Sequence, residues 1–149
     1  MRIGFTGTRH GMTAAQRKTF WKLIAELMPD SFHHGSCKGA DVQAARIVDQ
    51  VVPDGQVVAH PVPDGDDCQE PSGADDEVMP GKTHFARNRD IVNDCVLLIA
   101  CPLHMERRER GGTWYTVERA AKAGNMVRIV WPDGTVVDGR ELLLSRRGR

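Results

Sequence analysis

Length, composition and charge set the first limits on this protein. The chain has 149 residues, 40% of them hydrophobic, and its 20 Lys+Arg balance its 20 Asp+Glu. This length is typical of one domain, which we assign to residues 1–144, and we expect residues 145–149 to form a disordered basic tail. Zero net charge argues against a general polyanion binder, because sequence-independent affinity for nucleic acids comes from surplus cations.

The expected location is the cytoplasm. No apolar run reaches the length of about 18 residues that a membrane span requires, and the N-terminus lacks the apolar segment of a signal peptide. Of the four cysteines, none forms a C-x-x-C pair, and a chain of this size does not need disulfides, so we expect reduced thiols. Cys37, close to a helix start and to His33 and His34, could alternatively serve as a thiolate nucleophile.

Short apolar runs alternate with helical patterns in the first 60 residues. Residues 2–6, 31–34 and 56–60 are predicted strands. Thr13 and Gln16 have the spacing of a capping box that opens a helix, which Pro29 ends. Residues 41–51 show the apolar periodicity of a second helix.

The second half repeats this alternation after a long acidic loop. Residues 61–82 contain four prolines and seven acidic side chains but no Lys or Arg before Lys82. Loops of this length in compact domains are usually functional or disordered. Further on, helices are predicted over 83–93 and 113–123, strands over 96–100 and 127–131, and a hairpin strand over 135–137.

This order of elements predicts the α/β class. Strand–helix alternation with an entirely apolar strand at 96–100 indicates a doubly wound, mainly parallel five-stranded sheet with a C-terminal hairpin. Ligands of such sheets bind beyond the carboxyl ends of the strands, where the strand order reverses.

Three loops at those ends carry the candidate ligand-binding residues, although none contains G-x-G-x-x-G or a P-loop. The candidates in these loops are Gly7, Thr8, Arg9, Gly35, Ser36, Gly39, Asp41, Gly111, Gly112, Thr113 and Thr116. Backbone N–H groups at helix starts, hydroxyls and a guanidinium suit a phosphate, and Asp41 could accept hydrogen bonds from ribose hydroxyls. Alternatively, the loops are tight turns with solvated charges, and Asp41 only stabilises the start of its helix.

Nothing in the spacing of potential ligands indicates a metal. His33, His34, His60 and His84 do not follow a metal-binding motif such as H-E-x-x-H, and the acidic loop lacks the ligand order of an EF-hand. We therefore predict no metal and no cofactor.

Four stretches together resemble the SLOG superfamily of Rossmann-like nucleotide-ligand proteins, in particular its small single-domain bacterial and phage branch. They are Gly4-Phe5-Thr6-Gly7-Thr8-Arg9, His34-Gly35-Ser36-Cys37-Lys38-Gly39-Ala40-Asp41, Arg87-Asn88-Arg89 and Gly111-Gly112-Thr113-Trp114. The resemblance covers residues 1 to about 131. It implies a Rossmann-like fold, a nucleotide-derived ligand, and binding roles for Arg87 and Asn88. Because this fold often pairs through helices, it also makes a homodimer an expectation.

The superfamily includes phosphoribohydrolases that release cytokinin-type bases, with a P-G-G-x-G-T-x-x-E motif and an upstream Arg. The resemblance makes Glu118 the counterpart of the motif's Glu and Arg87 that of the Arg. The chain departs from the motif, since eight residues separate Pro102 from Gly111 and Trp114 stands in place of the third glycine.

Three functions follow as hypotheses. The leading one is a domain that binds a nucleotide or nucleotide-derived small molecule, such as a sensor. The alternative is an N-glycosidase acting on a nucleoside monophosphate, with Glu118, Asp41 and Arg87 as catalytic residues. A third, nucleic-acid binding through arginines 107–110, is disfavoured by the net charge. We further hypothesise that the 62–81 acidic loop folds over the arginines when no ligand is bound.

Overall fold

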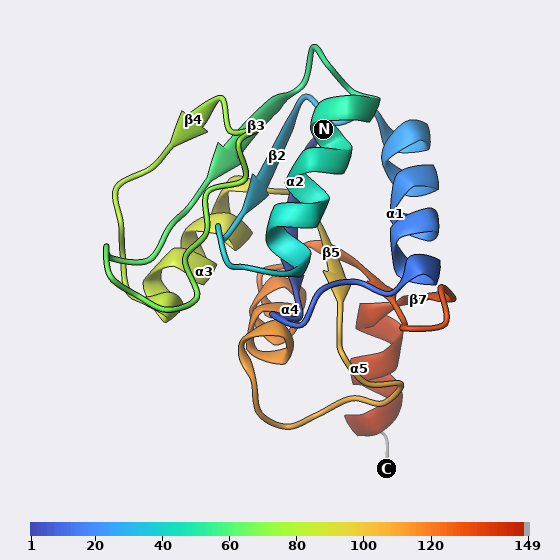
Figure 1. Cartoon of the computed structure of the whole chain (residues 1–149). Helices are drawn as coiled ribbons and strands as arrows, with labels where there is room; N and C mark the ends of the chain where they lie inside the picture. Colours follow the sequence, from blue (N-terminus) through green and yellow to red (C-terminus); the bar gives the residue numbers. More distant parts are fainter. Residues whose placement is uncertain (148–149) are drawn as a thin grey trace.

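The computed structural model describes residues 1–147, with side chains to residue 144, and contains a seven-stranded sheet flanked by helices (Figure 1). The strands are β1 (Arg2–Gly7), β2 (Ser31–His34), β3 (Gln56–Ala59), β4 (Glu77–Val78), β5 (Leu97–Cys101), β6 (Met126–Val130) and β7 (Val136–Asp138). The helices are α1 (Ala14–Leu27), α2 (Ala40–Val51), α3 (His84–Asp94), α4 (Gly112–Lys122) and α5 (Gly139–Arg147). Within the described residues, no helix has the length and apolar character needed to cross a membrane.

The order of strands across the sheet is β4-β3-β2-β1-β5-β6-β7. All neighbours are parallel except β6 and β7, which form the antiparallel hairpin predicted from the sequence. The chain proceeds outward from β1 to β4 and then crosses back to β5 on the other side of β1. The strand order therefore reverses between β1 and β5, which is where ligands bind in doubly wound sheets.

Alternation along β5 divides the core between the two faces of the sheet. Leu97, Ile99 and Cys101 pack with α1 and α2, whereas Leu98 and Ala100 pack with α3, α4 and α5. Successive side chains of a strand point to opposite faces, so an entirely apolar strand is one that is covered on both.

The α/β class and the parallel arrangement of the five predicted strands, now β1, β2, β3, β5 and β6, agree with the sequence prediction, but the sheet has seven strands in all. The strand missed is β4, which consists of two exposed residues inside the predicted acidic loop. It is held by pairing with β3, and Asp76 and Met79 on either side donate backbone hydrogen bonds to Val57 and Ala59. Two exposed residues carry no periodicity, so only tertiary pairing reveals this strand.

The predicted tail is wrong in part, because α5 continues through Arg147. Asp138 begins this helix by accepting hydrogen bonds from the backbone N–H groups of Arg140 and Glu141, and Leu143 packs into the core. Residues 148–149, the end of the predicted tail, lie outside the described residues.

Local signals elsewhere are confirmed. Thr13 and Gln16 form the reciprocal capping box of α1, and the Thr83 hydroxyl accepts a hydrogen bond from the N–H of Ala86 at the start of α3. These caps fix where the helices begin, and hence where the loops that precede them meet the edge of the sheet.

Candidate functional site

A cavity of about 1180 Å³ lies at the carboxyl ends of β1 and β5, where the strand order reverses. Small-molecule sites in proteins typically have roughly 300–1,000 Å³. The structure brings most of the candidate residues to this cavity: Gly7, Thr8, Arg9, Gly35, Asp41, Arg87, Asn88, Gly111, Gly112, Thr113 and Glu118. The carboxyl ends of parallel strands share one edge of the sheet, which is why loops far apart in sequence converge here.

Three other candidates, Ser36, Gly39 and Thr116, do not line the cavity. Thr116 is fully buried, and its hydroxyl donates a 2.8 Å hydrogen bond to the carbonyl of Gly112, one turn earlier in α4. Ser36 is buried, and its N–H donates to Nδ1 of His34.

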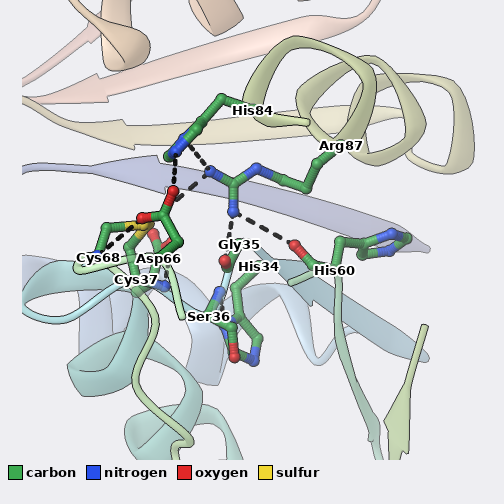
Figure 2. The surroundings of a disulfide bond; sticks show 10 residues. His34, Gly35, Ser36, Cys37, His60, Asp66, Cys68, His84 and Arg87 are labelled. Carbon is green, nitrogen blue, oxygen red and sulfur yellow. Dashed lines mark hydrogen bonds and ion pairs between the residues drawn. A yellow bond between two sulfur atoms is a disulfide. The ribbon is translucent and has the colours of Figure 1, made fainter. Parts of the chain in front are cut away.

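Arg87, from α3, is buried in the lining of the cavity and is bonded to two neighbouring loops and to the start of its own helix (Figure 2). Its Nη1 donates to the carbonyls of Gly35 and His60, the latter at 3.3 Å. Its Nη2 lies 3.3 Å from Nδ1 of His84 and 3.8 Å from Sγ of Cys37. The guanidinium thus joins α3 to the loops that follow β2 and β3, which leaves little of its donor capacity for a phosphate.

Asp41 is similarly occupied. Its carboxylate accepts hydrogen bonds from the backbone N–H groups of Cys37, at 3.2 Å, and Gly35. Burial raises the pKa of Asp41, against the opposing effects of His34 and Arg87. Gly35, Cys37, Asp41 and Arg87 together form what we call the bonded wall of the cavity.

Cys37 and Cys68 form a disulfide, so the prediction of four reduced thiols is wrong for this pair (Figure 2). The bond also excludes Cys37 as a nucleophile in this state. The two residues lie 31 positions apart, and their Cα atoms approach to 4.8 Å because the acidic loop pairs with the β2–α2 loop. Cys95 and Cys101 are free and buried, and burial raises the pKa of Cys95 to about 12.

The glycines of the first two loops allow close approach of other protein segments, not of a ligand. A Cβ on Gly7 would lie 2.6 Å from Cβ of Ala40, and a Cβ on Gly35 would overlap the Arg87 guanidinium. Gly39 has φ +89°, and a Cβ there would overlap the carbonyl of Arg9. Their lack of a side chain lets the β1–α1 loop, the β2–α2 loop and α3 pack directly together.

Another part of the cavity lining, by contrast, keeps its polar groups available. Helix α4 begins at Gly111, which has φ +114° and no side-chain cap, and a Cβ on Gly111 or Gly112 would meet nothing within 4 Å. The first N–H groups of a helix have no partner within it, so those at the start of α4, which lines the cavity, are available at the positive end of the helix dipole.

Four side chains complete this part of the lining. Those of Arg9 and Asn88 form no hydrogen bond or ion pair with any described residue, although both line the cavity. Phe85, which is 61% exposed, packs edge-on against Tyr115 with ring centroids 4.6 Å apart. We call the set of Arg9, Phe85, Asn88, Gly111, Gly112, Thr113 and Tyr115 the open wall. The aromatic pair was missed from sequence, where the available signal is an aromatic residue exposed on a helix near a candidate loop.

Glu118 also lines the cavity and forms an ion pair with Arg107. Arg108 pairs with Glu106 at 3.1 Å, within the same loop. Within the described part of the chain, the acidic loop thus forms no ion pair with Arg107 or Arg108, although the charge of its Asp66 acts on Arg9 and Arg87. Its Asp75 contacts His34 at 2.6 Å and its Asp66 contacts His84 at 3.1 Å, which places the acidic loop against the bonded wall.

No known family model matches the chain, and no curated protein matches its sequence. Solved structures do share its fold. The molybdenum cofactor binding protein from the phototrophic bacterium Rippkaea orientalis is 20% identical, with a TM-score of 0.69 over 99% of this chain and 84% of that one. The Moco carrier protein from Chlamydomonas reinhardtii is 22% identical, with a TM-score of 0.56 over 86% and 74% of the two chains.

DNA processing protein A (DprA) from Streptococcus pneumoniae is 24% identical, with a TM-score of 0.68. The match includes 99% of this chain and 56% of DprA, so this chain spans about half of that protein. At such identities the likeness establishes the fold alone. The chain is a Rossmann-like α/β domain with a cavity at the carboxyl edge of its sheet.

Proposed function

We propose that the cavity binds a nucleotide or another phosphate-bearing small molecule, with its anionic group at the N-terminus of α4. The observation that carries this proposal is the uncapped Gly111–Gly112 start of a helix opening into a cavity that also contains the unpaired guanidinium of Arg9. Backbone N–H groups, a helix dipole and a charged donor are the combination that binds phosphates.

The rest of the open wall suits the remainder of such a ligand. Asn88 offers both a donor and an acceptor to the edge of a heterocycle, because its amide has no protein partner among the described residues. The exposed face of the Phe85–Tyr115 pair offers a stacking surface at the rim of the cavity. Two of the structural neighbours are named for a bound or carried cofactor, which supports a small molecule as the ligand class.

We propose binding rather than hydrolysis. An N-glycosidase needs a carboxylate placed against a developing positive charge or an attacking water. Glu118 is held by Arg107, and Asp41 is held by two backbone N–H groups, so neither carboxylate is free in this structure. Incubation of the protein with nucleoside monophosphates, followed by chromatography for free base, tests this choice, and base release that Glu118→Gln abolishes would establish the hydrolase instead.

Gly112 allows a direct test of the anion site. Its Cβ position is open and its φ is ordinary, so Gly112→Asp and Gly112→Asn introduce side chains of equal size that differ in charge. A carboxylate at a helix start stabilises the helix but repels a bound anion. Native mass spectrometry of the purified protein would first identify a co-purified ligand, and calorimetry would then measure binding of that ligand or of the common nucleoside 5′-monophosphates.

We expect Gly112→Asp to weaken binding at least tenfold, or by about 1.4 kcal/mol, and Gly112→Asn to stay within about threefold of the wild type. Equal losses in the two variants would show that the anion does not lie at this helix start. Absence of both a co-purified ligand and any monophosphate binding would count against the proposed ligand class.

A further inference from the structure

Away from the open wall, three metal-ligating side chains converge on the α3 side of the sheet. They are His33 of β2, His60 just after β3, and Asp94, the last residue of α3. His33 Nδ1 lies 2.9 Å from His60 Nε2, which lies 3.8 Å from a carboxylate oxygen of Asp94. All three donor atoms lie within 4.8 Å of one another.

Sheet register explains why these residues meet although their spacing in sequence is no metal motif. His33 pairs with Val58 on the neighbouring parallel strand, and His60 lies two residues beyond Val58. Side chains two residues apart point to the same face, so the two imidazoles become diagonal neighbours. Asp94 then reaches them from the end of the helix that covers this face.

The surroundings favour a cation. Both imidazoles are buried, and burial lowers the pKa of His33 and lowers that of His60 to about 4, which leaves both rings neutral at pH 7. The Ser31 hydroxyl lies 3.0 Å from His33 Nε2. When Nε2–H donates to that hydroxyl, Nδ1 presents its lone pair toward His60, which is how an outer partner orients a metal-binding histidine.

His33 Nδ1 and His60 Nε2 are joined by a hydrogen bond, so one proton lies between these two nitrogens. A metal ion bound by both nitrogens would take the place of that proton. Besides Asp94, the side chains that act on these rings are Glu77, Asp90, Arg2 and His34, which makes three carboxylates against one guanidinium and one imidazole. The cluster therefore combines two neutral nitrogen donors with a net negative field.

We propose that His33, His60 and Asp94 bind a divalent zinc-type cation, with water as the fourth ligand. Bonds of about 2.0–2.1 Å in a tetrahedral site place neighbouring donors roughly 3.3 Å apart. The observed separations bracket this value, and the half-exposed side chain of Asp94 is the ligand free to move inward. Two imidazoles and one carboxylate favour zinc over magnesium or calcium, which prefer oxygen ligands.

A second cluster, Asp66, Cys68 and His84, also brings potential ligands together. Cys68 is bonded to Cys37, so its sulfur is not a thiolate ligand in the oxidised protein. This cluster provides the matched control, because Asp66→Asn repeats the change Asp94→Asn at a site where no metal is expected.

The test uses full-length protein treated with a chelator and kept free of reductant. Titration with cobalt(II), a spectroscopic substitute for zinc, is expected to give the visible absorption of a tetrahedral site at one equivalent. Saturating zinc, at about 100 times its Kd, is expected to raise the Tm by about 5–10 °C. Asp94→Asn should weaken cobalt binding at least tenfold, while Asp66→Asn should leave it within about twofold.

His60→Gln should abolish the cobalt spectrum, and if that buried variant folds poorly, the surface variant Asp94→Asn decides the question. A wild type that gives neither the spectrum nor the thermal shift would overturn the proposal. Equal losses in the two aspartate variants would overturn it as well, since metal would then be bound elsewhere or by charge alone.

Discussion

The two walls of the cavity use similar residues in opposite ways. In the bonded wall, Arg87 and Asp41 direct their polar atoms at neighbouring loops, and both are buried. In the open wall, Arg9 and the first N–H groups of α4 have no such partners. The position of an arginine in a cavity lining is therefore not enough to show that it binds a ligand. The distinction is whether its donors are already used within the protein.

Arg87→Ala should give the largest effect, because the bonded wall is expected to act on stability. The change leaves the carbonyls of Gly35 and His60 unsatisfied and removes a cation that acts on buried Asp41. We expect the free energy of unfolding to fall by about 3–5 kcal/mol, measured by urea denaturation.

Arg89→Ala, an exposed arginine on the same helix, should change stability by no more than about 0.5 kcal/mol. If Arg87→Ala instead keeps wild-type stability and loses only ligand binding, Arg87 belongs to the open wall and the division is wrong.

Gly39→Ala tests whether the first two loops depend on direct backbone packing. Gly39 has φ +89°, and a Cβ would overlap the Arg9 carbonyl, whereas Gly65 has φ +88° with nothing within 4 Å. The two positions have nearly the same positive φ and differ in the overlap that a Cβ would meet. We expect losses of about 3 kcal/mol at Gly39 and about 1 kcal/mol at Gly65 by chemical denaturation. Similar losses would mean that the loops separate easily.

Sequence reasoning performed well where the signal is local. The alternation of elements predicted the doubly wound sheet, the Thr13–Gln16 spacing predicted a capping box, and the 135–137 segment predicted the hairpin. The convergence of the candidate loops followed from parallel strands alone. No knowledge of side-chain contacts was needed for these predictions.

It failed where the answer depends on contacts between distant segments. The Cys37–Cys68 disulfide and β4 both arise from the acidic loop packing against the β2–β3 side of the sheet. The role of Gly35 differs from expectation for the same reason, since the group that approaches it is Arg87 rather than a ligand. The residue type at a position predicts which chemistry its side chain can perform. The partner that the side chain contacts depends on how distant segments pack.

Arg9→Gln should separate binding from stability on the open wall. Because the Arg9 side chain forms no hydrogen bond or ion pair with a described residue, and its charge attracts Asp66 but repels Arg87, its loss should leave the free energy of unfolding within about 0.5 kcal/mol of the wild type. One lost charge-assisted hydrogen bond should weaken nucleotide binding roughly tenfold, as measured by calorimetry. Lys22→Gln, on α1 and outside the cavity, removes the same charge and should leave the affinity unchanged. Equal weakening by both variants would indicate long-range attraction rather than contact.

Asp41→Asn should give the smallest effect, visible as a dependence on pH. Burial raises the pKa of Asp41 in the folded protein above its ordinary value of 3.8, so the folded state holds this proton more tightly than the unfolded chain. The stability that this provides is complete below pH 3.8 and is lost as the pH rises through the raised pKa. Asparagine does not titrate. The free energy of unfolding of the variant, relative to the wild type, should therefore increase between about pH 4 and 7, by an amount on the order of 1 kcal/mol.

Asp49→Asn, on the exposed side of α2, provides the baseline for this series of urea denaturations. One outcome is that the free energy of unfolding of Asp41→Asn, relative to the wild type, increases with pH while the nucleotide affinity is unchanged. That result would place the Asp41 carboxylate among the groups that hold the β2–α2 loop. A relative free energy of unfolding that does not change with pH, together with a loss of nucleotide affinity, would instead mean that this carboxylate exchanges its backbone partners for the ligand. The bonded wall would then open when the site is filled, because the N–H groups of Gly35 and Cys37 would need new acceptors.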